Sequence, residues 1–117
     1  MIQSKSKMGA DTILHEIAGS SYVEGLKKVN YKEIRMQYSD KEFTSGILSY
    51  KIYIPTRRDY EVTAFLVDQV ISEGYNIIVY DSWIVCTDGA RNYANSQNIK
   101  LYSYVNFVNH VKSGKSL

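Results

Sequence analysis

One apolar segment near the middle of the chain constrains the fold more than any other feature. Between Asn76 and Thr87, apolar and mostly β-branched residues follow one another with a single Asp-Ser interruption. Such a run is typical of a strand that is covered on both faces of a sheet. The interruption leaves two interpretations open: one long strand with a bulge, or two short strands, Asn76–Tyr80 and Trp83–Thr87, joined by a tight turn.

The residues after this run indicate a short helix and then another strand. Thr87 or Asp88 can cap the helix, alanine and tyrosine recur within it at helical spacing, and Asn98 closes it. Ile99 and Leu101 then resume an alternating pattern. A strand, a helix and a strand in this order predict a crossover connection within a parallel or mixed sheet.

The remaining segments have their own periodicities, and their boundaries are set by caps and turn residues. In order, they predict a helix capped by Asp11 or Thr12 that runs to Leu26, a strand over Val29–Ser39, a turn over Asp40–Gly46, a strand over Ile47–Ile54, a helix capped by Asp59 with Gly74 just past its end, and a terminal helix over Val105–Lys112.

This order predicts an α/β fold: a single-domain, three-layer sandwich with a central mixed sheet of four to five strands flanked by helices. The domain is expected over residues 10–113, between a flexible arm at 1–9 and a flexible tail at 114–117. At 117 residues with 44% apolar content, one domain can bury a substantial core. That single core is predicted to contain Val62, Phe65, Leu66, Val70, Ile77, Val79, Ile84 and Leu101.

Net charge, cysteine count and the distribution of apolar residues limit the partners, cross-links and location that this chain can have. The net charge of +2 permits a nucleic-acid partner without indicating one. The single cysteine, Cys86, excludes an internal disulfide and is expected to fill the core. No segment is apolar enough to span a membrane, so a cytoplasmic protein is expected.

The segment IIVYDSWIVCTDGARNYANSQNIKLYSYVNFVNHV resembles the last third of Mrr-type proteins with the restriction-endonuclease-like fold. Similar features are an apolar strand that ends in Thr, a short helix with Ala-Arg-x-Tyr-Ala, an Ile-x-Leu strand and a final helix. The resemblance covers roughly residues 75–112, and the predicted order of helices and strands is that of the fold's common core.

The resemblance implies a Mg²⁺ site built from an acidic residue at the end of one strand and a Glu-x-Lys or Gln-x-Lys on the next. On this chain it assigns the acidic position to Asp40 and the lysine to Lys51 as catalytic residues. Ser49 stands where Glu or Gln is expected, and no proline precedes Asp40. Glu16 on the first helix could supply a second metal carboxylate.

Each of these residues also has a purely structural interpretation. Asp40 can simply start a turn, and Lys51 can be a strand lysine that faces solvent. Arg57 and Arg58 could contact nucleic-acid phosphates, although a basic pair on a loop is often only solvated.

Two hypotheses of function follow. In the first, the protein associates with nucleic acid, DNA more readily than RNA, either as a Mg²⁺-dependent nuclease or as a degenerate member that does not cleave. In the second, it is a non-enzymatic interaction module that acts through a homodimer or heteromeric interface. Convergence of Asp40, Lys51 and Glu16 in space would separate the two.

Overall fold

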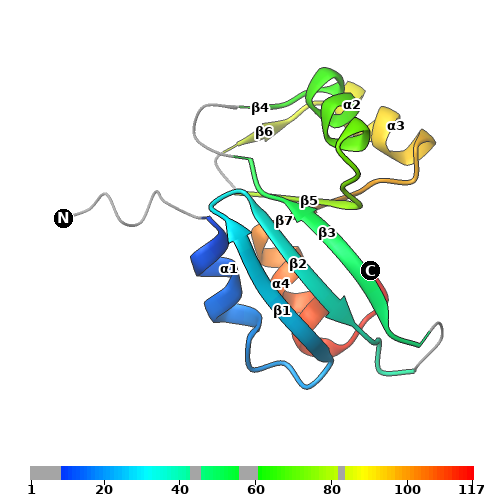
Figure 1. The fold of residues 1–117 in the computed structure, drawn as a ribbon. Helices are drawn as coiled ribbons and strands as arrows, with labels where there is room; N and C mark the ends of the chain where they lie inside the picture. The colour runs from blue at the N-terminus through cyan, green and yellow to red at the C-terminus, as the bar shows by residue number, and fades with distance from the viewer. Residues whose placement is uncertain (1–8, 43–45, 56–60, 82–83) are drawn as a thin grey trace.

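A computed structural model describes residues 9–42, 46–55, 61–81 and 84–117. It contains a five-stranded sheet with helices on both faces and a small two-stranded sheet beside it (Figure 1). The elements are α1 (Ala10–Ile17), β1 (Val23–Asn30), β2 (Glu33–Tyr38), β3 (Leu48–Tyr53), β4 (Glu61–Val62), α2 (Ala64–Ser72), β5 (Ile77–Tyr80), β6 (Val85–Cys86), α3 (Asp88–Ser96), β7 (Lys100–Ser103) and α4 (Tyr104–Ser113).

The main sheet is mixed, as the sequence predicts. Its strand order is β1-β2-β3-β5-β7. Strands β1, β2 and β3 pair antiparallel, whereas β5 lies parallel to β3 and β7 parallel to β5. Helices α2 and α3 provide the crossovers that these parallel pairs require. The α/β class and the mixed sheet of four to five strands flanked by helices are therefore confirmed.

One face of the sheet is covered by α1 and α4. Ile34, Met36 and Tyr38 alternate along β2 toward this face, where they pack with side chains such as Ile13 of α1 and Phe107 of α4. The period of two in the strand and the apolar stripes of the helices bury each other in one cluster.

The other face has a separate core that covers only the parallel part of the sheet. Ile78 of β5 packs there against α2 and α3, while its neighbours Ile77 and Val79 belong to the first cluster. The prediction of a single core is therefore wrong, because successive residues of a strand point to opposite faces. Phe65 is also wrongly placed in the predicted core, since it is 72% exposed.

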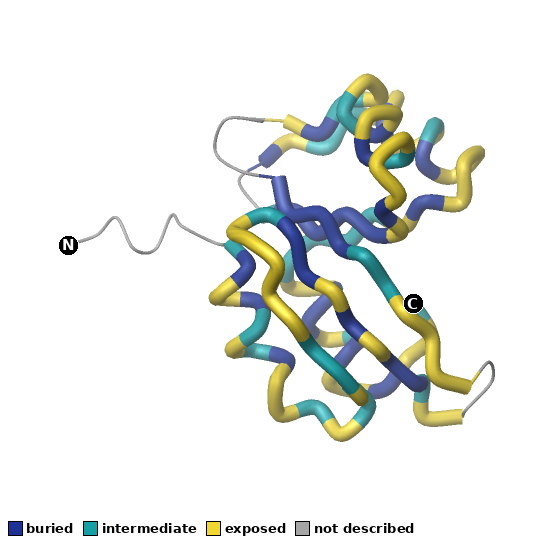
Figure 2. Tube along the Cα trace, viewed as in Figure 1, coloured by how far each residue is buried: buried dark blue, intermediate teal, exposed yellow. Residues whose placement is uncertain are grey.

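The antiparallel part of this second face has no described helix over it. Figure 1 shows the front of β1, β2 and β3 free of helices, with α1 and α4 behind them. Figure 2 shows mostly exposed residues along β1 and an alternation of exposed and buried residues along β2. An open sheet face results.

The sequence does not predict strand β1, which takes up the end of the expected first helix and the start of the strand expected after it. The first helix ends at Ile17 instead of reaching Leu26, and the residues from Val23 onward form β1. The expected single strand Val29–Ser39 is interrupted by a turn in which the Asn30 side chain accepts a hydrogen bond from the backbone of Lys32 at 2.9 Å. Asn30 is a turn-forming residue, but no glycine follows it, so the strong Asn-Gly signal for a hairpin is absent.

The helix boundaries also differ in one place from the prediction. Helix α2 is capped by Thr63, whose side chain accepts from the Leu66 amide, and not by Asp59, which lies outside the described residues. Thr87, one of the two expected caps, caps α3, and Gly74 follows α2 with a φ of 86°. Strand β6 pairs in parallel with β4, so the long apolar run forms two strands in two sheets.

The expected flexible tail at 114–117 makes several contacts with β2 and the residues that follow it. The Tyr38 hydroxyl lies 2.6 Å from the carbonyl oxygen of Lys115, and the Lys41 amide donates to Gly114 at 2.8 Å. The Ser116 hydroxyl donates to the Asp40 carboxylate at 2.9 Å. These contacts bring the C-terminal residues to one end of the open sheet.

Candidate functional site

Three positively charged side chains form a row across the open face of the sheet. In the strand register Lys27 pairs with Arg35, and Arg35 pairs with Lys51. Paired residues of antiparallel strands point to the same face, so these three are direct neighbours on β1, β2 and β3, and we call them the basic row. Like charges placed directly opposite each other repel, so the arrangement is unfavourable unless an anion neutralises it.

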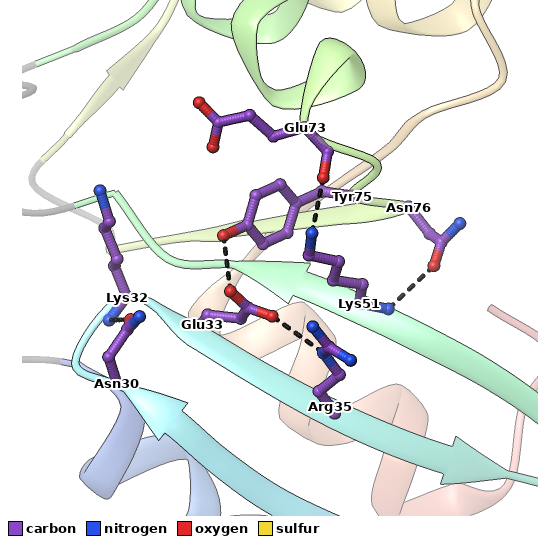
Figure 3. Close-up of polar contacts among 8 residues, drawn as sticks. All are labelled: Asn30, Lys32, Glu33, Arg35, Lys51, Glu73, Tyr75 and Asn76. Carbon is purple, nitrogen blue, oxygen red and sulfur yellow. Dashed lines mark hydrogen bonds and ion pairs between the residues drawn. The ribbon is translucent and has the colours of Figure 1, made fainter.

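A buried carboxylate supports the middle of the basic row (Figure 3). Glu33 Oε2 accepts a hydrogen bond from Arg35 Nε at 2.9 Å, and Glu33 Oε1 accepts one from the Tyr75 hydroxyl at 2.9 Å. The Glu33 side chain is only 9% exposed, whereas that of Arg35 is 57% exposed. Glu33 thus holds the inner edge of the guanidinium group while its outer edge faces solvent.

The hydrogen bond between Glu33 and Tyr75 shifts the pKa of both side chains. Burial acts to raise the pKa of Glu33, but hydrogen bonds from Arg35 and Tyr75 and the nearby charges of Lys51 and Arg35 lower it overall. Burial, together with the hydrogen bond to the Glu33 carboxylate, raises the pKa of Tyr75 to about 12. Glu33 is therefore charged and Tyr75 neutral at physiological pH.

Lys51 is held by the loop that connects α2 to β5. Its Nζ donates to the carbonyl oxygen of Glu73 at 2.6 Å and lies 4.4 Å from the centre of the Tyr75 ring (Figure 3). Its backbone amide donates to the Asn76 side chain at 2.8 Å. The positive φ of Gly74 lets the chain turn sharply between these contacts.

A cleft of about 630 Å³ lies over the basic row. Besides the three cations, its lining includes Gln37, Ser49 and Asn76. Gln37 and Ser49 pair with each other and lie two residues along the strands from Arg35 and Lys51, on the same face. Gly25 pairs with Gln37, and a Cβ there would lie 2.8 Å from the Gln37 amide oxygen, so glycine leaves room for that side chain.

The chemistry of this cleft favours an anion. Three of its side chains, Lys27, Arg35 and Lys51, are cations that only donate hydrogen bonds, and Gln37, Ser49 and Asn76 can donate as well as accept. The two carboxylate oxygens of Glu33 already have partners in Arg35 and Tyr75. Within the described ranges, no group of three or more His, Cys, Asp or Glu side chains is placed to hold a metal ion. Arginine and lysine on a donor-rich surface are the groups that bind phosphate.

The structure brings only one of the predicted catalytic residues into this site. Lys51 lies in the basic row, but Asp40 follows the far end of β2 and lines a different, smaller pocket with Ser116. Glu16 of α1 bonds to Lys112 of α4 at 3.3 Å on the opposite face of the sheet. The three residues expected to share a site are thus at three places. Arg57 and Arg58 lie outside the described residues.

The sequence interpretation missed most of the site. The sequence places Glu33 and Arg35 on the more polar face of a strand over Val29–Ser39, and it leaves Lys27 between that strand and the helix that ends at Leu26. The sequence does contain a signal for a polar sheet face. Glu33, Arg35 and Gln37 alternate with apolar residues, and Ser49 and Lys51 occupy every second position of the next strand. Without the strand register, however, that alternation does not show which residues are opposite.

A scan against models of protein families, a search of curated proteins and a search of solved structures each found no match. Among the helices that the structure describes, none has the length and apolar character needed to cross a membrane.

Proposed function

We propose that this protein binds nucleic acid through its phosphate groups at the basic row, as a non-cleaving member of the restriction-endonuclease-like fold. The observation that carries the proposal is the row itself: Lys27, Arg35 and Lys51 in register on a sheet face that no described helix covers. Adjacent strands lie ~4.8 Å apart, so the row spans ~10 Å. It is therefore wide enough to contact more than one phosphate of a nucleic-acid backbone.

The order of the elements supports the proposed fold family. In the main sheet, a helix, antiparallel strands, a helix, a strand, a helix and a strand follow one another, which is the order of that fold's common core. The sequence resemblance over residues 75–112 covers only the part from β5 to α4. Because fold alone does not determine activity, the proposal rests on the site.

The donor set of the cleft favours binding over Mg²⁺-dependent cleavage. Mg²⁺ prefers carboxylate oxygens in near-octahedral geometry, and none of the described residues that line the cleft is Asp or Glu. The nearby Glu33 carboxylate is already bonded to Arg35 and Tyr75. Ser49 supplies only a neutral hydroxyl oxygen. We therefore expect no cleavage of supercoiled, linear or single-stranded DNA with Mg²⁺ or Mn²⁺ beyond that seen with EDTA.

The test compares two triple variants that remove equal charge. In the first, Lys27, Arg35 and Lys51 are replaced by alanine, and in the control Lys28, Lys100 and Lys112 are replaced instead. Lys28 and Lys112 form ion pairs with Asp11 and Glu16, and Lys100 lies in the edge strand β7. Binding to labelled duplex DNA, single-stranded DNA and RNA is measured by fluorescence anisotropy at several salt concentrations.

The first variant should reduce the slope of log affinity against log salt by about one unit for each lost phosphate contact, up to about three. The control should change the slope much less. We expect DNA to bind more tightly than RNA. Equal effects of the two variants would refute the assignment of the basic row. A further arm replaces Arg57 and Arg58 with alanine, which is predicted to remove about two units of slope.

The alternative is an interaction module, and one observation favours it. Strand β1 is an edge strand of the sheet, and Val29 and the neighbouring Tyr31 are 42% and 65% exposed. Exposed edges with apolar side chains can pair with another chain. If the parent protein binds none of the nucleic acids at low salt and light scattering gives twice the mass of one chain, the homodimer hypothesis replaces nucleic-acid binding.

A further inference from the structure

Glu33 is an unexpected residue to find beneath a site for anions. A carboxylate repels a phosphate, and burying a charge costs free energy unless the charge is paired. Glu33 is nevertheless almost fully buried, and each of its oxygens accepts a hydrogen bond. Its role must outweigh the repulsion if the cleft binds phosphate.

The geometry of Arg35 suggests that role. A free arginine side chain samples many rotamers, and ordering it on binding costs conformational entropy. Here Glu33 bonds to Nε, so this hydrogen bond uses neither of the two terminal nitrogens. Arg35 lines the cleft, and its side chain is largely exposed. A planar guanidinium held in this way can donate two parallel hydrogen bonds to one phosphate group.

Tyr75 in turn holds Glu33. Its hydroxyl donates to the second carboxylate oxygen, and its ring packs edge-on against Tyr53 with centroids 5.3 Å apart. The same ring lies beneath the Lys51 ammonium group. Tyr75 therefore links the two cations of β2 and β3 to the second core.

We propose that Glu33, itself held by Tyr75, is a positioning residue that orients Arg35 for two-pronged contact with a phosphate group. This inference rests on the proposed function and adds to it a residue that does not touch the ligand. It accounts for a buried negative charge in a site for anions, because preorganisation of Arg35 reduces the cost of binding.

Glu33→Gln separates positioning from simple electrostatics by the sign of its effect. If Glu33 acts only through its charge, removing that charge tightens DNA binding. If it positions Arg35, the variant loses the charge-assisted hydrogen bond, and we expect binding to weaken about tenfold. Glu16→Gln is the matched control, since it removes the same charge from the opposite face, and it should leave affinity nearly unchanged.

A double-mutant cycle measures whether the effect of Glu33→Gln on DNA binding depends on Arg35. If Glu33 only stabilised the fold, its effect would not depend on Arg35. In the Arg35→Ala background, Glu33→Gln should no longer weaken binding, because there is no guanidinium left to orient. Tyr75→Phe keeps the charge of Glu33 but removes one of its partners, and it should weaken binding by a smaller factor. Melting temperatures show whether each variant is folded under the conditions of the titration.

A measurement without nucleic acid distinguishes failure of this inference from failure of the proposed function. The Arg35 Nε–H signal in NMR spectra should be sharp in the parent, broadened in Glu33→Gln, and shifted by inorganic phosphate in the parent alone. If DNA does not bind but phosphate gives this pattern, the nucleic-acid proposal fails and the positioning role stands for a small phosphate ligand. Tighter or unchanged DNA binding by Glu33→Gln, or a phosphate shift equal in both proteins, would overturn the inference.

Discussion

Among the described residues, Glu33 is buried and Phe65 is exposed, the reverse of what their side-chain chemistry suggests. Glutamate is seldom buried without a partner, and this one has Arg35 and Tyr75. Phenylalanine usually lies in the core, yet Phe65 is 72% exposed near the start of α2. Neither position follows from residue type, since burial depends on the direction in which the fold turns each side chain.

The lowered pKa of Glu33 predicts a loss of stability in acid. Because the pKa in the folded state lies below the ordinary value of 4.5, Glu33 contributes its full stabilisation above about pH 4.5 and loses it as the pH falls through the folded-state value. Urea titrations between pH 7 and pH 3 should show a steeper loss of unfolding free energy for the parent than for Glu33→Gln. Parallel curves would mean that Glu33 gains nothing from Arg35, Tyr75 and Lys51.

Two phenylalanines provide a matched test of the core assignment. Phe107 of α4 is fully buried in the first cluster, so Phe107→Ala should lower the unfolding free energy by about 3–5 kcal/mol. Phe65→Ala should change it by less than about 0.5 kcal/mol, as is usual for exposed positions. Denaturant titration of both variants measures the difference, and a large loss at Phe65 would contradict its placement.

At the scale of elements, the sequence predicts what is strongly periodic and fails where tertiary pairing decides. The crossover after β5, the Thr87 cap and the terminal helix were all predictable, because each has a local signal. Strand β1 was not, since Val23 and Leu26 also fit the apolar stripe of a helix and the turn at Asn30 contains neither glycine nor proline. The basic row depends on that strand and on its register, so most of the site could not be predicted.

The start of α2 can be tested through its cap. The Thr63 side chain satisfies the Leu66 amide, so Thr63→Ala should lower the unfolding free energy by ~1 kcal/mol. Asp59→Ala should cost clearly less, because the helix begins after Thr63. Urea denaturation followed by circular dichroism measures both losses. A larger loss for Asp59→Ala than for Thr63→Ala would support the helix start predicted from the sequence.

At the scale of the whole molecule, one sheet separates two apolar clusters, and the second cluster covers only the parallel half. The sequence predicts the layers because helices and strands of this length must bury their apolar faces against each other. It does not predict which half of a face stays open, since this depends on where the crossover helices lie. The open half is where Lys27, Arg35 and Lys51 can meet a ligand.

The antiparallel strands β1, β2 and β3 also follow one another directly along the chain, whereas β5 and β7 join the sheet only after helices cross over it. Closing a short loop costs less entropy than closing a long one, so the three antiparallel strands should pair early as the chain folds. The wall of the cleft, which Asn76 supplies, would be added later. A partly folded chain would then already display its positive charges, so a polyanion could act on the folding route as well as on the finished protein.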